Sequence, residues 1–151
     1  MKEIGNLGEK LVESWLLNQQ YKILHKNWHC RWGEIDLIAQ EKSGKILAFV
    51  EVKTRGTNNW DEAGMLAITE KKQQKIIKTA QQFLALYPQF MENYCRFDVA
   101  LVSYQNINNQ IFSRNTNNVA FQDISIGKPV NWEQKYQLTL QNYLVSAFDV
   151  A

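Results

Sequence analysis

Two apolar segments separated by a short polar one constrain the fold of this chain most strongly. Residues 33–39 (GEIDLIA) alternate between the two sides of a strand, with Glu34 and Asp36 on one face and Ile35, Leu37 and Ala39 on the other. Residues 46–53 (ILAFVEVK) are apolar until their end, which is typical of a central strand. Residues 41–45 (EKSGK) are polar and contain a glycine, as hairpin turns do. The sequence therefore predicts a largely buried β-hairpin.

An amphipathic helix is expected on each side of this hairpin along the chain. Apolar residues recur at helical spacing through residues 4–17, and a short extended stretch follows at 21–24. Thr69 is a suitable N-cap for a second helix over residues 70–86, which Pro88 ends.

A further buried strand is expected at residues 96–102 (RFDVALV). A strand, a long helix and another strand favour a right-handed crossover with parallel pairing. The predicted fold class is therefore α/β, with an N-terminal helix followed by a β-hairpin and a βαβ core.

The last third of the chain has a different composition. Asparagines crowd into residues 106–118, which indicates a loop or hairpin. Residues 130–150 are compatible with one short helix or with two edge strands, and the pattern does not decide between them. The length of 151 residues suits a single domain, 1–151, with a core over 1–104 and an Asn-rich loop and C-terminal extension over 105–151.

Composition excludes several classes of protein. The longest run without a polar residue, residues 46–50, is too short to span a bilayer, and the first residues lack the apolar core of a secretory signal. Two cysteines, Cys30 and Cys95, are too few for a disulfide framework, so we expect reduced thiols and a cytoplasmic location without membrane contact. A net charge of +2 means that any binding of nucleic acid must come from a local patch.

The acidic residues within the two hairpin strands are the strongest candidates for chemistry. If the strands pair through the turn, Asp36 and Glu51 approach each other near one end of the sheet, and Glu51 and Lys53 share a face. Two carboxylates at an apolar strand end repel each other unless a cation neutralises them, and Mg²⁺ suits such a site. Lys53 could orient an attacking water or stabilise developing negative charge.

The spacing Glu-x-Lys alone carries little information. It occurs again at Glu70/Lys72, on a predicted helix where the two side chains do not face each other, and at Glu133/Lys135 in the C-terminal segment. Only Glu51 and Lys53 follow an acid-bearing strand.

Asp36, fourteen residues and then Glu51-Val52-Lys53 resemble the signature of the PD-(D/E)xK nuclease superfamily. The chain resembles the YraN family of small bacterial endonuclease-like proteins more closely. That family is related in shape to archaeal Holliday-junction resolvases, and the resemblance covers residues 1–104. The matching segments are Gly8-Glu9, Asn27, residues 33–38 (GEIDLI), residues 49–55 (FVEVKTR) and residues 96–99 (RFDV).

The resemblance implies a restriction-endonuclease-like mixed β-sheet flanked by helices. It also implies a metal-dependent endonuclease that hydrolyses phosphodiester bonds in DNA, in particular structured or branched DNA, as a homodimer suited to a two-fold substrate. Asp36, Glu51, Glu9 and the Val52 carbonyl would hold Mg²⁺, or Mn²⁺ in its place, and Lys53 would position the water. Glu9 could equally be an ordinary helix-surface acid, and Glu34 a solvent-facing or outer acid.

The alternative is a catalytically inactive nucleic-acid-binding or DNA-repair accessory module on the same fold. A third hypothesis is a protein-interaction domain with a structural acidic cluster.

Basic residues could contact the phosphates of a nucleic acid. Lys71, Lys72, Lys75 and Lys78 fall on one arc of the predicted helix 70–86. Together with Arg55, the lysines Lys72 and Lys75 would form a phosphate-binding stripe, although a solvated helix face is the ordinary explanation of such an arc.

Two further groups of residues invite functional hypotheses. His25, His29 and Cys30 lack a second ligand pair, so packing or loop roles are favoured over zinc binding. Trp28, Trp32 and Trp60 could stack on unpaired bases, but core packing is expected for at least two of them.

Overall fold

The predicted hairpin is present in the computed structural model, which describes residues 2–57, 68–107, 121 and 123–149. Strands β2 (Gly33–Gln40) and β3 (Ile46–Gly56) pair in antiparallel fashion. The Glu41 N–H donates to the Ile46 carbonyl at 3.0 Å and closes the turn. This ladder is short, because it joins only residues 37–40 to residues 47–50.

The hairpin belongs to a six-stranded sheet in the order β1-β2-β3-β4-β6-β5. Strand β1 (Lys22–Cys30) pairs antiparallel with β2. Strand β4 (Tyr94–Asn106) pairs parallel with the whole of β3 through its residues 94–104, which confirms the predicted parallel pairing. Strands β6 (Tyr136–Phe148) and β5 (Val130–Trp132) complete the sheet, so the C-terminal segment forms strands and not a helix.

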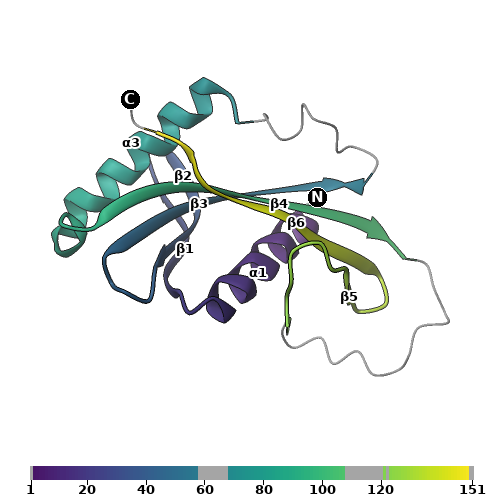
Figure 1. Cartoon of the computed structure of the whole chain (residues 1–151). Coiled ribbons are helices and arrows are strands. Elements are labelled where there is room, and N and C mark those ends of the chain that lie inside the picture. Colours follow the sequence, from purple (N-terminus) through teal and green to yellow (C-terminus); the bar gives the residue numbers. More distant parts are fainter. Residues whose placement is uncertain (1, 58–67, 108–120, 122, 150–151) are drawn as a thin grey trace.

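The two α-helices of the described residues lie on opposite faces of the sheet, as Figure 1 shows. Helix α1 (Lys2–Asn18) covers one face and α3 (Glu70–Leu86) the other, with the 3-10 turn η2 (Pro88–Phe90) after α3. The predicted α/β class, a mixed sheet flanked by helices, is confirmed and is consistent with the restriction-endonuclease-like fold. Within the described part of the chain, neither helix is long and apolar enough to cross a membrane.

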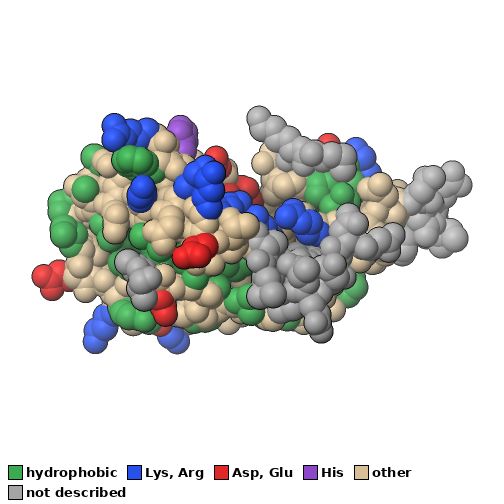
Figure 2. Space-filling view, turned by 90° about the horizontal axis from the view of Figure 1, so that it is seen from above, with side chains coloured by type: hydrophobic (Ala, Val, Ile, Leu, Met, Phe, Trp, Pro, Cys, Tyr) green, Lys and Arg blue, Asp and Glu red, His purple; other side chains and the backbone are tan. Residues whose placement is uncertain are grey.

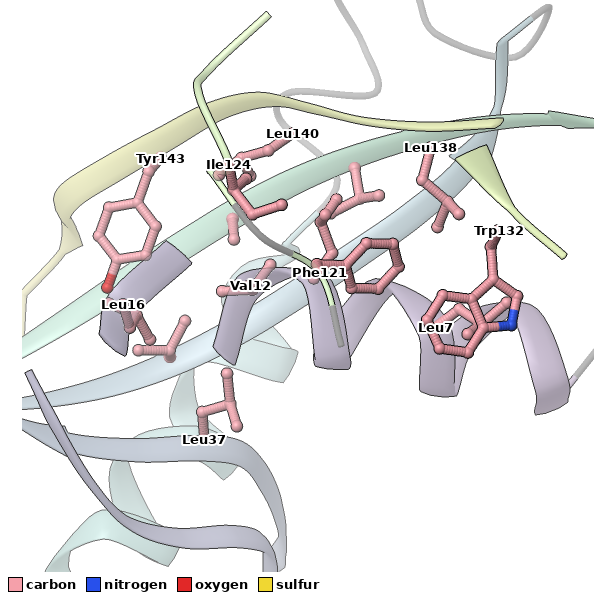
Figure 3. Packing of buried hydrophobic residues seen from close by; sticks show 14 of the residues in the cluster. Leu7, Val12, Leu16, Leu37, Phe121, Ile124, Trp132, Leu138, Leu140 and Tyr143 are labelled. Carbon is pink, nitrogen blue, oxygen red and sulfur yellow. The ribbon is translucent and has the colours of Figure 1, made fainter. Parts of the chain in front are cut away.

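Each helix buries its apolar stripe in a separate core. On the α1 side, Leu11, Val12 and Leu16 are fully buried against the sheet together with residues from β6, as Figure 3 shows for part of this cluster. On the α3 side, Phe83 packs on Phe49 with ring centroids 5.9 Å apart. The sheet is therefore buried on both faces, which explains the almost continuous apolar sequence of its central strands.

Helix ends and strand lengths differ in how well the sequence predicted them. Thr69 caps α3 as expected, since its Oγ1 accepts from the Lys72 N–H at 3.1 Å. Strand β1 extends to Cys30, well beyond the predicted stretch 21–24. Its sequence, KILHKNWHC, is polar on both faces and shows no alternation, so the pattern did not indicate a strand.

The predicted alternation along β2 is wrong at one point. Ile35 packs with Ile38 in the α3-side core, whereas Leu37 and Ala39 lie in the α1-side core. Asn27, which lies across from Asp36 in the β1–β2 pairing, has a φ of 50°. Asparagine tolerates this left-handed conformation better than most residues. The change of side at Asp36 therefore coincides with a local distortion of the neighbouring strand.

A buried ionic network joins the C-terminal strand to the core. Asp98 on β4 is fully buried and accepts from Arg96 Nη2 at 2.9 Å, from Tyr143 Oη at 2.7 Å and from the Ser146 N–H at 2.9 Å. Arg96 Nη2 also donates to Tyr21 Oη at 2.6 Å. Burial lowers the pKa of Arg96, but the hydrogen bonds that Arg96 donates to Asp98 and Tyr21 outweigh this and raise it, so the guanidinium stays charged. The network ties β6 to β4 at the centre of the sheet.

Candidate functional site

Asp36 and Glu51 lie where β2 and β3 separate. The last antiparallel pair joins Leu37 to Val50, and the next positions on the two strands are Asp36 and Glu51. Beyond that pair the ladder stops, and the Val52 N–H donates to Asp36 Oδ2 at 2.8 Å. The two predicted acids are thus brought together at the fork between the strands.

The carboxyl group of Asp36 is held in an environment that disfavours its charge. Burial, and then the neighbouring Glu51, raise the pKa of Asp36 to about 8, while the hydrogen bond from the Val52 N–H opposes this rise. Such a rise in pKa means that nearby positive groups do not fully compensate the negative charge of the ionised Asp36 carboxylate. A cation at this position would relieve that imbalance.

Two lysines face Glu51 from different elements. Glu51 is only 7% exposed, and its Oε2 lies 2.7 Å from Lys72 Nζ on α3 and 3.7 Å from Lys53 Nζ on β3. Burial, and then the hydrogen bond with Lys72, lower the pKa of Lys53 to about 8. The hydrogen bonds of Lys72 to Glu51 and Lys53 raise its pKa against the effect of burial. Leu47 and Phe49 lie in the α3-side core, as expected for residues that share a face of β3 with Glu51.

Glu9 approaches the same acids from α1. Asn27 Nδ2 donates to Glu9 Oε1 at 2.8 Å and to Glu34 Oε1 at 3.1 Å, so one amide bridges two carboxylates. Burial raises the pKa of Glu9, with smaller effects from Glu34 and Glu51 in the same direction, while Asn27 and Asp36 lower it through hydrogen bonds. Glu9 therefore lies close enough to Asp36 and Glu51 to affect their ionisation, and Asn27 links it to Glu34.

Gly8 explains how α1 comes close enough to place Glu9 there. A Cβ at position 8 would collide with the side chain of Thr54 on β3. Only a residue without a side chain allows this contact between helix and strand. The Oγ1 of Thr54 is buried and, within the described residues, has no hydrogen-bond partner.

The acids line a small open cavity of about 250 Å³ beneath α3. Gly33, Glu34, Asp36 and Glu51 contribute from the sheet, and Lys72, Lys75 and Ile76 contribute from α3. The structure thus brings Asp36, Glu51, Lys53 and Lys72 together and places Lys75 at the same cavity, whereas Glu9 lines a separate cavity of about 360 Å³ with Asn27. Arg55 lies outside it, exposed, with its Nη1 donating to the Thr54 carbonyl at 3.3 Å.

The donor atoms at this site suit a hard divalent cation. Asp36, Glu51 and Glu9 offer only carboxylate oxygens, which Mg²⁺ and Mn²⁺ prefer. Across residues 2–57, 68–107, 121 and 123–149, no three His, Cys, Asp or Glu side chains converge as a preformed metal site. Lys72 contacts Glu51 directly, so binding of a metal by both acids would require Lys72 to withdraw.

The histidines take no part in this site. His25 packs against Phe83 and Tyr87, with ring centroids 5.4 Å and 5.2 Å apart. The Nδ1 of His29 lies 3.3 Å from the Asn27 carbonyl oxygen. His25 is therefore a packing residue, whereas His29 is exposed at the surface of β1.

Sequence reasoning missed two features of the site. Asn27 was noted only as part of a resemblance, yet it bridges Glu9 and Glu34. Lys72 was assigned to phosphate contacts, yet it forms the shorter of the two ion pairs with Glu51. Both contacts join segments distant in sequence, and no local pattern signals them.

Comparison with known proteins places the chain in a family. A family model described as "Uncharacterised protein family UPF0102" matches residues 8–102, which include every candidate site residue. A UPF0102 protein of Nostoc sp. is 48% identical over 97% of this chain and 94% of its own length. Relatives from Acaryochloris marina and Synechocystis sp. are 45% and 44% identical, over 97% and 98% of this chain and over 90% and 99% of their own lengths. The chain therefore belongs to the UPF0102 family, which is the YraN family that its motifs resemble.

Proposed function

We propose that this chain is a metal-dependent endonuclease that hydrolyses phosphodiester bonds in DNA, in particular in structured or branched DNA. One observation carries the proposal. Glu51 is buried and Asp36 is partly buried at the strand fork, and burial together with the charge of Glu51 raises the pKa of Asp36 to about 8. A protein gains nothing in stability from such a pair, so a function that uses a cation explains it best.

The roles of the residues follow from their positions. Asp36, Glu51, Glu9 and the Val52 carbonyl would hold Mg²⁺, or Mn²⁺ in its place. The bound ion supplies positive charge that stabilises the transition state of phosphodiester hydrolysis. Lys53, whose Nζ lies 3.7 Å from Glu51 Oε2, orients the attacking water and stabilises developing negative charge. Lys75, at the cavity, and the exposed Arg55 contact phosphates of the substrate.

The choice of a branched substrate and of a homodimer depends on the resemblance to junction resolvases. A four-way junction has two-fold symmetry, which a symmetric dimer matches.

A second candidate function is supported by a different observation. The 2.7 Å contact of Lys72 with Glu51 already neutralises one of the two acids without a metal. That arrangement favours a catalytically inactive module that binds nucleic acid, or assists DNA repair, on the same fold.

A cleavage assay separates the two candidates. Wild type, Lys53→Ala and Lys42→Ala are incubated with Mg²⁺ and duplex, flap or four-way-junction DNA, and binding is measured in parallel. Lys42 is exposed in the hairpin turn and serves as the matched control. If the protein is a nuclease, wild type and Lys42→Ala cleave the DNA at similar rates. Lys53→Ala cleaves it at least about 100-fold more slowly but binds it with the same affinity. Salt-sensitive binding by wild type without cleavage would support the inactive module.

A further inference from the structure

Trp32 lies on the surface in contact with two cations. It is 38% exposed, in the turn between β1 and β2. The guanidinium carbon of Arg31 lies 4.5 Å from the centroid of its ring, and Lys78 Nζ lies 4.9 Å from it. Trp28, by contrast, packs edge-on against Phe83 in the core, with ring centroids 5.3 Å apart, and Trp60 lies outside the described residues. Of the two described tryptophans in the predicted group, only Trp28 is a core residue.

The cations near Trp32 lack acidic partners. Among the ion pairs of the described residues, none includes Arg31, Lys75 or Lys78. Figure 2, which looks down on the side that α3 covers, shows Lys and Arg side chains there, with some Asp and Glu side chains among them. Exposed cations that repel one another gain most from an anionic ligand, and phosphates of a nucleic acid supply it.

The position of Trp32 relative to the acidic cavity is fixed by close packing. A Cβ at Gly33 would come within 3.2 Å of Thr79 Oγ1, so the turn that carries Trp32 lies directly against α3. Gly33 also lines the cavity that contains Asp36 and Glu51. Trp32 and Asp36 are four residue steps apart along extended chain, or about 13 Å, which is roughly four stacked nucleotide steps.

We propose that Arg31, Trp32 and Lys78 bind an unpaired nucleotide of a DNA strand that leads into the acidic cavity. The indole ring stacks on the base, and the two cations contact the flanking phosphates. In a duplex the base faces are covered by neighbouring bases. The platform formed by Arg31, Trp32 and Lys78 therefore favours DNA with a single-stranded segment beside the cleaved bond. The assignment of substrate class rests on the proposed function, whereas the binding itself does not.

Binding in EDTA tests the platform without hydrolysis. The affinities of wild type, Trp32→Ala, Trp32→Phe and Lys78→Gln are measured by fluorescence anisotropy for labelled single-stranded and blunt duplex oligonucleotides. Tyr94→Ala is the matched control, since Tyr94 is an aromatic residue that is 64% exposed at the start of β4. Thermal melts confirm that each variant is folded.

The platform predicts a selective loss. Trp32→Ala weakens binding of the single strand by about 10-fold and that of the duplex by less than about 2-fold, while Trp32→Phe retains most of the affinity. For the single strand, the slope of the logarithm of the binding constant against the logarithm of the salt concentration is shallower by about 0.7 in Lys78→Gln than in wild type. An equal loss for both oligonucleotides, or an equal loss in Tyr94→Ala, would overturn the proposal. Failure of wild type to bind either oligonucleotide would also overturn it, and would leave an acidic protein as the partner of this surface.

Failure of the platform and failure of the nuclease proposal can be told apart. Selective single-strand binding through Trp32 by a wild type that never cleaves would refute the nuclease and support the platform. Metal-dependent cleavage by a wild type whose single-strand affinity is unchanged in Trp32→Ala would refute the platform alone.

Discussion

Lys72 Nζ lies 2.7 Å from Glu51 Oε2, so a side chain of α3 supplies the counter-charge of an acid on β3. Lys72 is partly exposed, with 42% of its side chain accessible, whereas the side chain of Glu51 is 9% accessible. This pair therefore stabilises the buried acid from the rim of the cavity, and it competes with any metal that binds there.

Replacement of Lys72 should make the site depend on metal. In Lys72→Met the buried Glu51 loses its closest cation, and we expect a loss of about 1 kcal/mol in the free energy of unfolding without metal. Added Mg²⁺ should then stabilise the variant more than it stabilises wild type. Urea unfolding with and without Mg²⁺ measures both effects, and Lys71→Met, at an exposed neighbouring position, is the control. A larger metal effect in wild type than in Lys72→Met would contradict this competition.

The stability of the protein should depend on the protonation of Asp36. The pKa of this group is raised from 3.8 to about 8 in the folded state. Between these two pH values the unfolded chain ionises while the folded carboxyl stays protonated, so stability falls as the pH rises from about 4 to about 8. Relative to wild type, Asp36→Asn should therefore gain up to about 6 kcal/mol across that range. Chemical unfolding at successive pH values gives this difference, and a constant difference would show that the group titrates normally.

Gly8 should be intolerant of even a methyl group. Gly8→Ala gains helix propensity worth about 1 kcal/mol, but the new Cβ meets Thr54, and such overpacking costs about 1–3 kcal/mol. We expect net destabilisation, and recovery when Thr54→Ala is added. Gly5→Ala is the control, because nothing lies within 4 Å of its added Cβ and only the helix propensity changes. Thermal melts of these three variants and wild type test this, and equal effects at positions 5 and 8 would argue against the close contact.

The buried network around Asp98 should contribute strongly to stability. Asp98→Asn removes the charge that Arg96 pairs with and disturbs the hydrogen bonds from Tyr143 and the Ser146 N–H. Removal of one partner of a buried ion pair costs about 3–5 kcal/mol. Asp149→Asn makes the same chemical change at an exposed position and should be neutral. If the two variants unfold at the same urea concentration, the network does not hold β6 in place.

Local pattern was sufficient to predict most of the fold. The apolar periods of residues 4–17 and 70–86, the turn at 41–45 and the N-cap at Thr69 are properties of short segments, and each is present in the structure. Strand β1 was largely missed, because its stability comes from pairing with β2 and not from alternation in its own sequence. The C-terminal strands were undecided for a similar reason, since β6 is fixed by β4 and by the buried Asp98.

The site was predictable only in part. The approach of Asp36 to Glu51 follows from the hairpin and from strand geometry. The contacts of Asn27 with Glu9 and of Lys72 with Glu51 depend on how two helices pack on the sheet, and sequence spacing does not encode them. The left-handed backbone conformation of Asn27 in β1 likewise depends on the pairing of β1 with β2.

Titration of Mg²⁺ with thermal stability as the readout tests the central claim most directly. Wild type and Asp36→Asn/Glu51→Gln are compared, with Glu92→Gln as a control at an exposed acid. A metal site predicts that at about 100 times Kd the melting temperature of wild type and of the control rises by about 5–10 °C, while that of the double variant does not change. It also predicts that the double variant is the more stable protein in EDTA, because two repelling acids have been removed. Two results would show that the acids are structural. One is an increase in melting temperature with Mg²⁺ that is equal in all three proteins. The other is the absence of any effect of Mg²⁺ on wild type together with a double variant that is less stable than wild type in EDTA.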